Sequence, residues 1–155
     1  MTYQLKNKPE ASAYSYGLRL LSFHGYSEAA LIQKLQRAYY EAAEIQKAIE
    51  KLKNYGFIND QKLAMSYFQK YFSSGKTGFY LIRAKLQQKG FSPEIIAKCL
   101  DNYDHDEAVQ QAEKLVQVHF AALQLQDKPK LARYLAARGF SSDIIQCVLE
   151  RLRCE

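Results

Sequence analysis

Six basic side chains in a stretch without acids are the residues best suited to chemistry in this sequence. From Gln61 to Pro93 there is no Asp or Glu, and the positive charges are Lys62, Lys70, Lys76, Arg83, Lys85 and Lys89. Clustered cations bind phosphates or acidic protein surfaces, and interleaved rings such as Tyr67, Tyr71 and Tyr80 can add stacking. The stretch predicts a binding surface; the alternative is a solvated helix face that only aids solubility.

A second basic group lies in the last third of the chain. It consists of Lys128, Lys130, Arg133 and Arg138. The formal net charge is +6, but it is unevenly spread: residues 59–103 contain seven Lys and Arg against three Asp and Glu, whereas residues 104–155 contain seven against eight. We therefore expect residues 59–103 to make the main electrostatic contact with a negatively charged partner.

Other motifs resemble catalytic or metal sites but lack an essential part. Gly75-Lys76-Thr77 is similar to the end of a phosphate-binding loop, but position 70, where that loop needs its first glycine, is a lysine. The acids around His105 suggest a metal site, but they fit the start of a helix better, where they cap it and offset its dipole. No serine or cysteine lies in a nucleophile elbow. We expect no enzyme activity, no cofactor and no metal.

Cysteine usage and hydropathy favour a cytoplasmic protein. Cys99, Cys147 and Cys154 form no CxxC pair and are odd in number, which argues against a disulfide framework and against a zinc ribbon. The first residues have no apolar core of a signal peptide, and no apolar run approaches the roughly 18 residues that span a bilayer. We expect a soluble chain without a membrane partner, with Cys99 in a helical core.

A repeated pattern indicates how the basic side chains are positioned. Leu86–Leu100 returns as Leu135–Leu149 with seven of fifteen residues identical, and Leu35–Ile49 is a weaker copy. The copies are 51 and 49 residues apart. In the two stronger copies a helix-ending leucine is followed by a cation, glycine, phenylalanine and serine, which is typical of a helix, a tight turn and a second helix. Such repeats stack and expose a long surface for a partner.

Apolar spacing and capping residues predict an all-α fold without strands. The expected helices are 10–23, 28–37, 41–53, 60–72, 78–89, 93–101, 104–125, 129–138 and 142–152. They form three tandem three-helix repeats in an elongated, curved arrangement, with boundaries at 1–58, 59–103 and 104–155. Ser27, Asn59, Ser92 and Ser141 are expected to cap helices. The glycines of the loop 73–78 are expected to act as a hinge that presents Lys76.

In their order and spacing these features resemble the RecX family of bacterial regulatory proteins, the modulators of the RecA recombinase. The similarity covers about Ala11 to Leu152. The residues that carry it include Tyr26-Ser27-Glu28, Gly56-Phe57-Ile58-Asn59-Asp60, Lys89-Gly90-Phe91 and Arg138-Gly139-Phe140-Ser141.

The resemblance implies a monomer that binds the RecA filament on single-stranded DNA and restrains its ATPase, filament extension and strand exchange. It would thereby regulate recombination, DNA repair and the SOS response without chemistry of its own. The contact residues are assigned from charge rather than from a family signature: Lys34, Arg37, Lys70, Lys76, Arg83, Lys85, Lys89, Lys130, Arg133 and Arg138. The alternative is a basic helical module that binds single- or double-stranded DNA independently of RecA.

The first repeat departs from the pattern of the other two. Ala38-Tyr39-Tyr40 has no glycine where the others have Gly90 and Gly139. Because a glycine in the left-handed conformation ends those helices, we expect the first turn to differ in angle. His24-Gly25 also stands where relatives often have arginine, and Asn59 where they often have aspartate.

Overall fold

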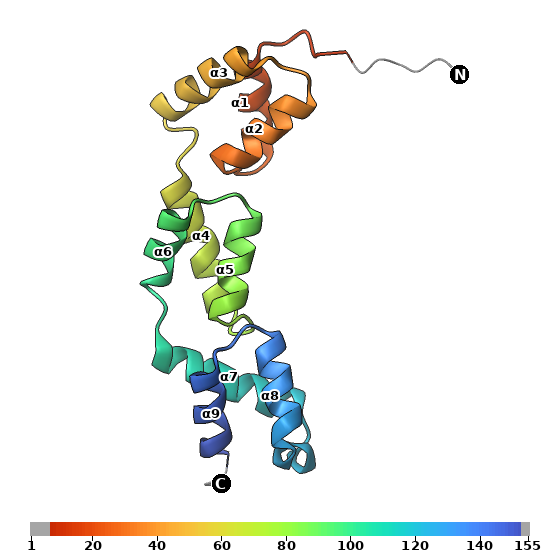
Figure 1. Ribbon diagram of the computed structural model, residues 1–155, viewed down its shortest axis with the longest axis vertical. Coiled ribbons are helices and arrows are strands. Elements are labelled where there is room, and N and C mark those ends of the chain that lie inside the picture. Colours follow the sequence, from red (N-terminus) through yellow and green to blue (C-terminus); the bar gives the residue numbers. More distant parts are fainter. Residues whose placement is uncertain (1–6, 153–155) are drawn as a thin grey trace, which may run out of the picture. The chain divides into compact units, whose positions relative to one another are not determined.

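The structure is a computed structural model that describes residues 7–152 (Figure 1). In this range the protein consists of helices and the turns that connect them. The helices are α1 Ala13–Phe23, α2 Glu28–Arg37, α3 Ala42–Asn54, α4 Asp60–Ser73, α5 Phe79–Gln88, α6 Pro93–Leu100, α7 His105–His119, α8 Lys128–Ala137 and α9 Ser142–Arg151, with a 3₁₀ helix, η1, at Ala122–Gln126. No strand occurs among residues 7–152, so the predicted all-α fold is confirmed. Cys154 lies outside the described residues.

The largest difference from the predicted helices concerns α7. A single helix over 104–125 was expected, and this prediction is wrong, because α7 ends at His119 and Phe120 has an extended backbone with φ −111° and ψ 141°. Phe120 is buried, with its ring 5.1 Å from that of Tyr134 on α8. Leaving the helix at this point lets the Phe120 ring pack on α8, and η1 then completes the connection.

Side-chain caps begin most of the helices as expected. Ser27, Asn59 and Ser92 each accept a hydrogen bond from the backbone N–H three residues further on. Ser141 makes no such bond, so its predicted cap is wrong. Its hydroxyl is hydrogen bonded to the Asp143 carboxylate instead.

The chain divides into two compact units. Unit 1 contains the described residues up to Leu63 together with Lys89–Phe91, and unit 2 contains Ala64–Gln88 and the described residues from Ser92 onward. The repeat boundaries at 1–58, 59–103 and 104–155 are not tested by this division and stay a prediction.

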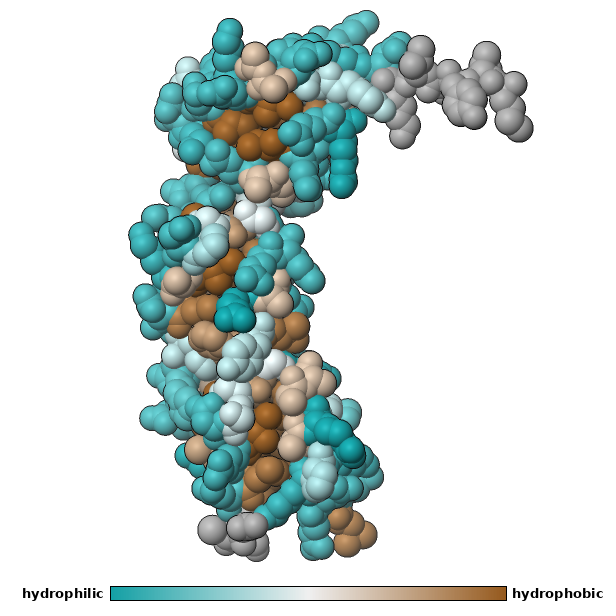
Figure 2. Space-filling model, viewed as in Figure 1, coloured by the Kyte–Doolittle hydropathy of each residue, from teal (hydrophilic) through white to brown (hydrophobic). Residues whose placement is uncertain are grey.

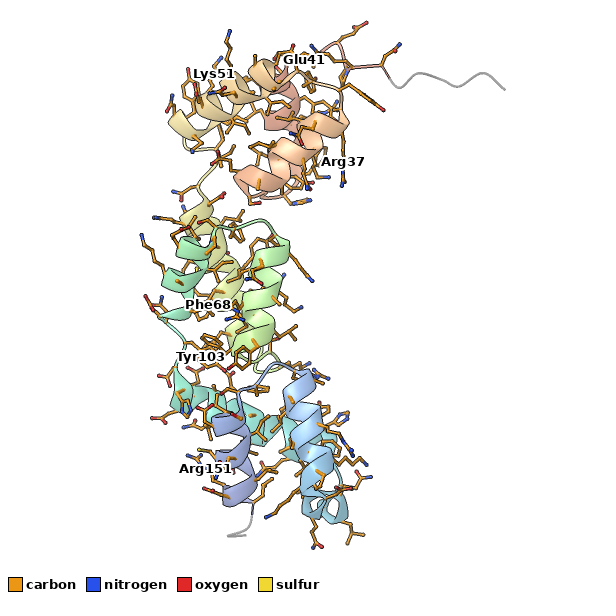
Figure 3. The ribbon with its side chains drawn as sticks, viewed as in Figure 1. Arg37, Glu41, Lys51, Phe68, Tyr103 and Arg151 are labelled. Carbon is orange, nitrogen blue, oxygen red and sulfur yellow. The ribbon has the colours of Figure 1, made fainter. Side chains whose placement is uncertain are left out.

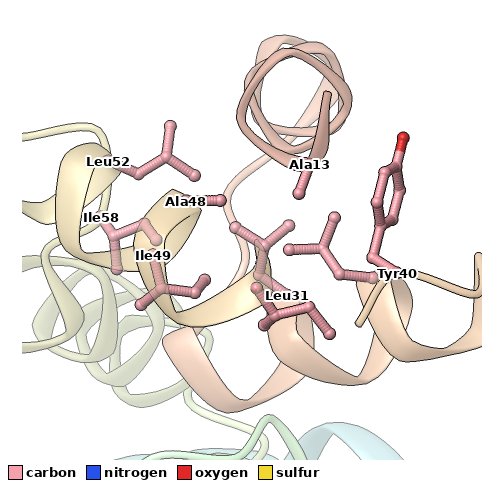
Figure 4. Close-up of a cluster of buried hydrophobic side chains, with 9 residues drawn as sticks. Ala13, Leu31, Tyr40, Ala48, Ile49, Leu52 and Ile58 are labelled. Carbon is pink, nitrogen blue, oxygen red and sulfur yellow. The ribbon is translucent and has the colours of Figure 1, made fainter. Parts of the chain in front are cut away.

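The core of unit 1 is a cluster of apolar side chains from α1, α2 and α3 (Figure 4). Its members are Ala13, Leu31, Leu35, Tyr40, Ile45, Ala48, Ile49, Leu52 and Ile58. Leu31, Leu35 and Leu52 are fully buried, and burying a leucine contributes about 2 kcal/mol. The Tyr40 hydroxyl donates to the carbonyl of Ala11 at 2.6 Å, which satisfies the one polar group of the cluster.

Unit 2 repeats this core at the equivalent positions. Ile82 and Leu86 on α5, and Leu131 and Leu135 on α8, are fully buried like Leu31 and Leu35 on α2. Cys99 is also buried, as expected, and burial raises the pKa of its thiol. Between α4 and α5 the core is aromatic: the ring of Tyr103 lies 5.2 Å from that of Phe72 and 5.3 Å from that of Phe79. Burial raises the pKa of Tyr103 to about 12.

The turn that follows α2 has the same backbone conformation as its glycine-containing counterparts. Tyr39 has φ 64°, in the left-handed region that Gly90 and Gly139 occupy at 87° and 85°. The N–H groups of Tyr40 and Phe140 each donate to the carbonyl five residues earlier, at 3.2 and 3.1 Å. Tyr39 thus adopts the conformation of the two glycines, and a non-glycine residue in this region carries strain. The expected difference in the angle of the first turn stays a prediction.

Each of two helix starts is docked on a later turn, and we call these contacts the first and second joints. The first joint, inside unit 1, brings Ser27–Ala30 against the turn Lys89–Phe91. The buried Ser27 hydroxyl donates to the Lys89 carbonyl, and a Cβ added to Gly90 would lie 3.0 Å from the Ser27 oxygen. This joint is therefore made largely by one side chain.

The second joint, inside unit 2, brings Gly78–Leu81 against Arg138–Phe140. The N–H of Gly78 donates to the Arg138 carbonyl at 2.8 Å, and the N–H of Tyr80 donates to the Gly139 carbonyl at 3.0 Å. A Cβ on Gly78 would lie 2.3 Å from the Phe140 nitrogen, and a Cβ on Gly139 would lie 2.4 Å from the Leu81 nitrogen. The expectation that Gly78 belongs to a hinge is therefore wrong, because its backbone is held against another backbone.

Candidate partner-binding surfaces

The ten cations assigned from the sequence all lie on helices or their connections within the described residues. Arg37, Lys70, Lys76, Arg83, Lys130 and Arg133 are exposed, and Lys34, Lys85, Lys89 and Arg138 are partly exposed. Leaving Lys89 aside, none of them forms an ion pair with an acid of residues 7–152. Their charges are therefore available to a partner.

Aromatic rings hold five of these cations. The nitrogen or guanidinium carbon lies 5.0 to 5.7 Å from a ring centroid in each pair: Lys34 with Tyr26, Arg83 with Tyr80, Lys85 with Tyr71, Lys130 with Phe120, and Arg138 with Tyr134. Such contacts contribute about 0.5–1 kcal/mol at exposed sites. They orient the cations without neutralising them. From the sequence, only Tyr71 and Tyr80 stood out, since the other rings are distant from the basic stretch.

The two cations of α5 do not share a face. Residues two apart differ by about 200° around a helix. Arg83 lines the groove between α5 and α6, whereas Lys85 lies over the Tyr71 ring of α4. The structure thus separates Arg83 from Lys85, and a partner that lies on one side of α5 can contact only one of them closely.

On α8 the cations do lie together. Lys130 and Arg138 lie four residues before and after Tyr134, so these three side chains share one helix side; Arg138 is the residue that follows α8. Arg133 lies three residues after Lys130 and borders it on the side away from Arg138. The Tyr134 ring is stacked with His119 at 4.4 Å and an interplanar angle of 16°. We call these residues the α8 cluster; it combines positive charge with stacked rings.

On α2, Lys34 and Arg37 line one hollow. It has a volume of about 210 Å³ and is also bordered by Tyr16, Leu20 and Ala38. Arg37 lies at the C-terminal end of α2 (Figure 3). The hollow can hold a small anionic group between two cations.

Two equivalent grooves lie on the described residues. One copy lies between α2 and α3 with a volume of about 420 Å³, and the other lies between α5 and α6 with about 440 Å³. Eight lining positions match at a spacing of 51 residues: Glu28 and Phe79, Ile32 and Arg83, Gln36 and Gln87, Ala42 and Pro93, Ile45 and Ile96, Gln46 and Ala97, Ile49 and Leu100, Glu50 and Asp101. Figure 2 shows apolar surface in the first groove, bordered by hydrophilic side chains. Only the second copy contains an arginine.

The acids near His105 serve helix starts. Asp104 accepts from the Glu107 N–H at 2.9 Å and caps α7. His105 lies 2.8 Å from Asp143, and hydrogen bonds from Ser141 and then His105 lower the Asp143 pKa to about 2. Within residues 7–152, no three His, Cys, Asp or Glu side chains are grouped to hold a metal ion. In the same range, no helix combines the length and apolar character of a membrane span.

The helices form repeated units, and their surfaces carry exposed cations, rings that contact these cations, and equivalent grooves. These features define a helical repeat protein. Sequence models of the first and third three-helix domains of RecX match residues 13–52 and 102–149. The "Regulatory protein RecX" of Trichlorobacter lovleyi is 32% identical over 94% of this chain and 97% of its own length. The chain belongs to the RecX family of regulatory proteins.

Further relatives agree with this assignment. The RecX protein of Streptococcus uberis is 33% identical over 98% of this chain, which spans 61% of that protein's length. The crystal structure of RecX from Lactobacillus salivarius has the same fold, with a TM-score of 0.81, 24% identity, and coverage of 92% of this chain and 96% of that one. The family is regulatory and non-enzymatic, in agreement with the prediction that the chain is no enzyme.

Proposed function

We propose that this chain binds the RecA recombinase filament on single-stranded DNA and inhibits its ATPase, extension and strand exchange. The supporting observation is the set of ten assigned cations, nine of which have no ion pair within the described residues. A filament of protein and DNA offers carboxylates and phosphates to such side chains. The chain would act in the bacterial cytoplasm as a monomer, in the regulation of recombination, DNA repair and the SOS response.

The partner-binding residues of this proposal are those assigned from the sequence, grouped by the helix that carries them. The α2 group contains Lys34 and Arg37, and the α8 group contains Lys130 and Arg133 together with Arg138, which follows the helix. The middle group contains Lys70, Lys76, Arg83, Lys85 and Lys89. Because the binding is mainly electrostatic, it should weaken as the salt concentration rises.

The test measures inhibition of the DNA-dependent ATPase of RecA by variants of each group. Changing the three α8 cations to alanine removes about 0.5–1 kcal/mol per contact, so we expect about ten- to 150-fold more protein for half inhibition. Arg83→Ala and Lys85→Ala should differ from each other, because these side chains lie on opposite sides of α5.

The matched control removes the same charge from other exposed lysines. Lys47, Lys62 and Lys98 are exposed and outside the proposed groups, so their triple alanine variant should inhibit like the unchanged protein. Equal inhibition by the α8 variant and by this control, with circular dichroism unchanged in both, would reject the proposed contacts.

The α8 cluster favours one alternative, a module that binds DNA independently of RecA. Stacked rings next to cations suit single-stranded nucleic acid, since bases stack on the rings while phosphates meet the charges. Titration of labelled single- and double-stranded DNA without RecA separates the two functions. Tight binding that is lost with Tyr134→Ala supports the alternative, whereas binding that requires RecA supports the main proposal.

A further inference from the structure

Unit 2 contains a pocket in which Lys76 is the one residue that also belongs to the proposed RecA contacts. It lies between the loop after α4 and one side of α7, and has a volume of about 340 Å³. Leu115 and Val118 of α7 form its apolar part, and Val118 is 78% exposed. An apolar side chain so exposed beside a pocket is suited to contact with another apolar group.

The loop that forms the other wall is held in place. The Ser74 hydroxyl donates to the Tyr71 carbonyl at 2.7 Å, and the N–H of Lys76 donates to the Ser74 oxygen at 3.3 Å. Gly75 has φ 69° and faces the side chain of Gln111 on α7. The backbone at Lys76 is therefore held in place before any partner arrives, which lowers the entropic cost of binding.

The charge of the pocket is positive. Lys76 and Lys114 line it from its two walls, and both are exposed. No acid lines it, and the nearby acids of α7 are engaged elsewhere: Glu113 pairs with Arg151 at 3.4 Å, and Glu107 accepts from Gln111 at 3.1 Å. The positive charges of Lys76 and Lys114 are therefore not balanced by any acidic side chain that lines the pocket.

We propose that this pocket binds a short acidic peptide segment of a partner protein. An apolar side chain of the segment rests on Leu115 and Val118, and flanking carboxylates meet Lys76 and Lys114. The pocket volume of about 340 Å³ is near the lower end of the range of about 300–1,000 Å³ for ligand sites, so the pocket suits one large side chain. Nucleic acid fits less well, because no aromatic ring lines the pocket to stack a base, and phosphates gain nothing from Val118.

The test uses the full chain labelled with ¹⁵N and three fluorescein-labelled ten-residue peptides. Each peptide has Leu, Ile or Phe at its centre, flanked by Asp and Glu. At least one should shift the amide signals of Gly75, Gln111 and Val118. Lys114→Glu and Val118→Ser should each weaken that peptide at least about tenfold, as expected for a lost charge pair or apolar contact. Versions with Asn and Gln in place of the acids, or Ser in place of the anchor, should lose binding.

Two variants control for charge and exposure. Lys62→Glu makes the same charge change on α4, and Phe23→Ser removes an apolar side chain that is also 78% exposed. Both should bind the peptide like the unchanged chain. The proposal is overturned if all three peptides leave the pocket signals unmoved at millimolar concentration, if Lys114→Glu binds equally well, or if oligo-dT displaces the peptide. Lys114 is absent from the proposed RecA contacts and RecA is absent from the assay, so failure here leaves the proposed function intact.

Discussion

The two joints occupy the same place in the repeat but tolerate change very differently. In the first joint the Ser27 side chain reaches the Lys89 carbonyl, and the nearest neighbours of an added Cβ at Gly90 are side-chain atoms at 3.0 and 3.1 Å. In the second joint, backbone meets backbone at Gly78 and Gly139, with no room for a Cβ. Equivalent contacts in a repeat protein can therefore be made either by a replaceable side chain or by a backbone approach that only glycine permits.

Replacing the glycines should give the largest effect. Gly139→Ala places a Cβ against the Leu81 backbone at φ 85°, and we expect a loss of about 3 kcal/mol or more in the free energy of unfolding. Gly90→Ala should cost about 1–2 kcal/mol, because it is opposed by its left-handed conformation and by close contacts with Ser27 Oγ and Ala29 Cβ at 3.0 and 3.1 Å, and by no backbone atom nearer than 3.7 Å. Urea unfolding measures both. Amide exchange at Gly78 and Tyr80 should accelerate only in Gly139→Ala; equal losses in the two variants would mean that the joints do not differ.

Removing the side chain of the first joint should give the next largest effect. Ser27→Ala deletes a helix cap and a buried hydrogen bond, each worth about 1 kcal/mol, so the expected loss is about 2 kcal/mol. Ser92→Ala is the matched control, since it removes only a cap and should cost about 1 kcal/mol. Thermal unfolding followed by circular dichroism compares the two variants. If Ser27→Ala loses no more stability than Ser92→Ala, the Ser27 hydroxyl does not stabilise the joint.

The first turn should gain stability from the residue that its counterparts have. Tyr39 is in the left-handed conformation and more than half exposed, so Tyr39→Gly relieves strain while losing little packing. We expect a gain of about 0.5–1 kcal/mol, measured by urea unfolding. Tyr55→Gly, at an exposed residue with φ −83°, is the control and should destabilise. A loss with Tyr39→Gly would show that the ring contributes more than the strain costs.

The smallest effect concerns pH at the helix after the second joint. The Asp143 pKa is lowered to about 2 by Ser141 and then by His105. Because the folded pKa lies below the ordinary value, this contribution is present above about pH 4 and is lost as the pH falls through 2. The side chain is exposed, so the contribution is less than about 1 kcal/mol. The stability difference between the unchanged chain and Asp143→Asn should shrink from pH 5 to pH 2; a constant difference would contradict this origin.

Local signals in the sequence predict most of the helices. Buried Leu31, Leu35, Ile82 and Leu86 follow helical spacing, and capping side chains lie where the helices begin. The end of α7 was missed because it depends on Phe120 packing against α8, a contact that local spacing does not record. Tyr39 was missed because the left-handed conformation is expected of glycine, and tertiary contacts overrode that preference.

The binding surfaces were predicted less completely than the fold. Charge counts locate the cations but not the rings that orient them, because Tyr26 and Phe120 lie outside the basic stretch. The separation of Arg83 from Lys85 follows from their spacing on a helix and could have been predicted. Lys114 gave no signal, since only the long-range contact between α7 and the loop at Gly75 places it beside Lys76.

The joints also determine when each helix start gains its partner while the chain is made on a ribosome. The Ser27 hydroxyl donates to a carbonyl that lies 62 residues later in the chain. The N–H of Gly78 likewise donates to the later carbonyl of Arg138. At about 5–20 residues per second, the start of α2 lacks its acceptor for about 3 to 12 seconds. The first joint can therefore form as soon as the turn at Lys89 has emerged, and the second joint forms later, when the turn at Arg138 emerges. The nascent protein thus becomes ordered from its N-terminal end onward.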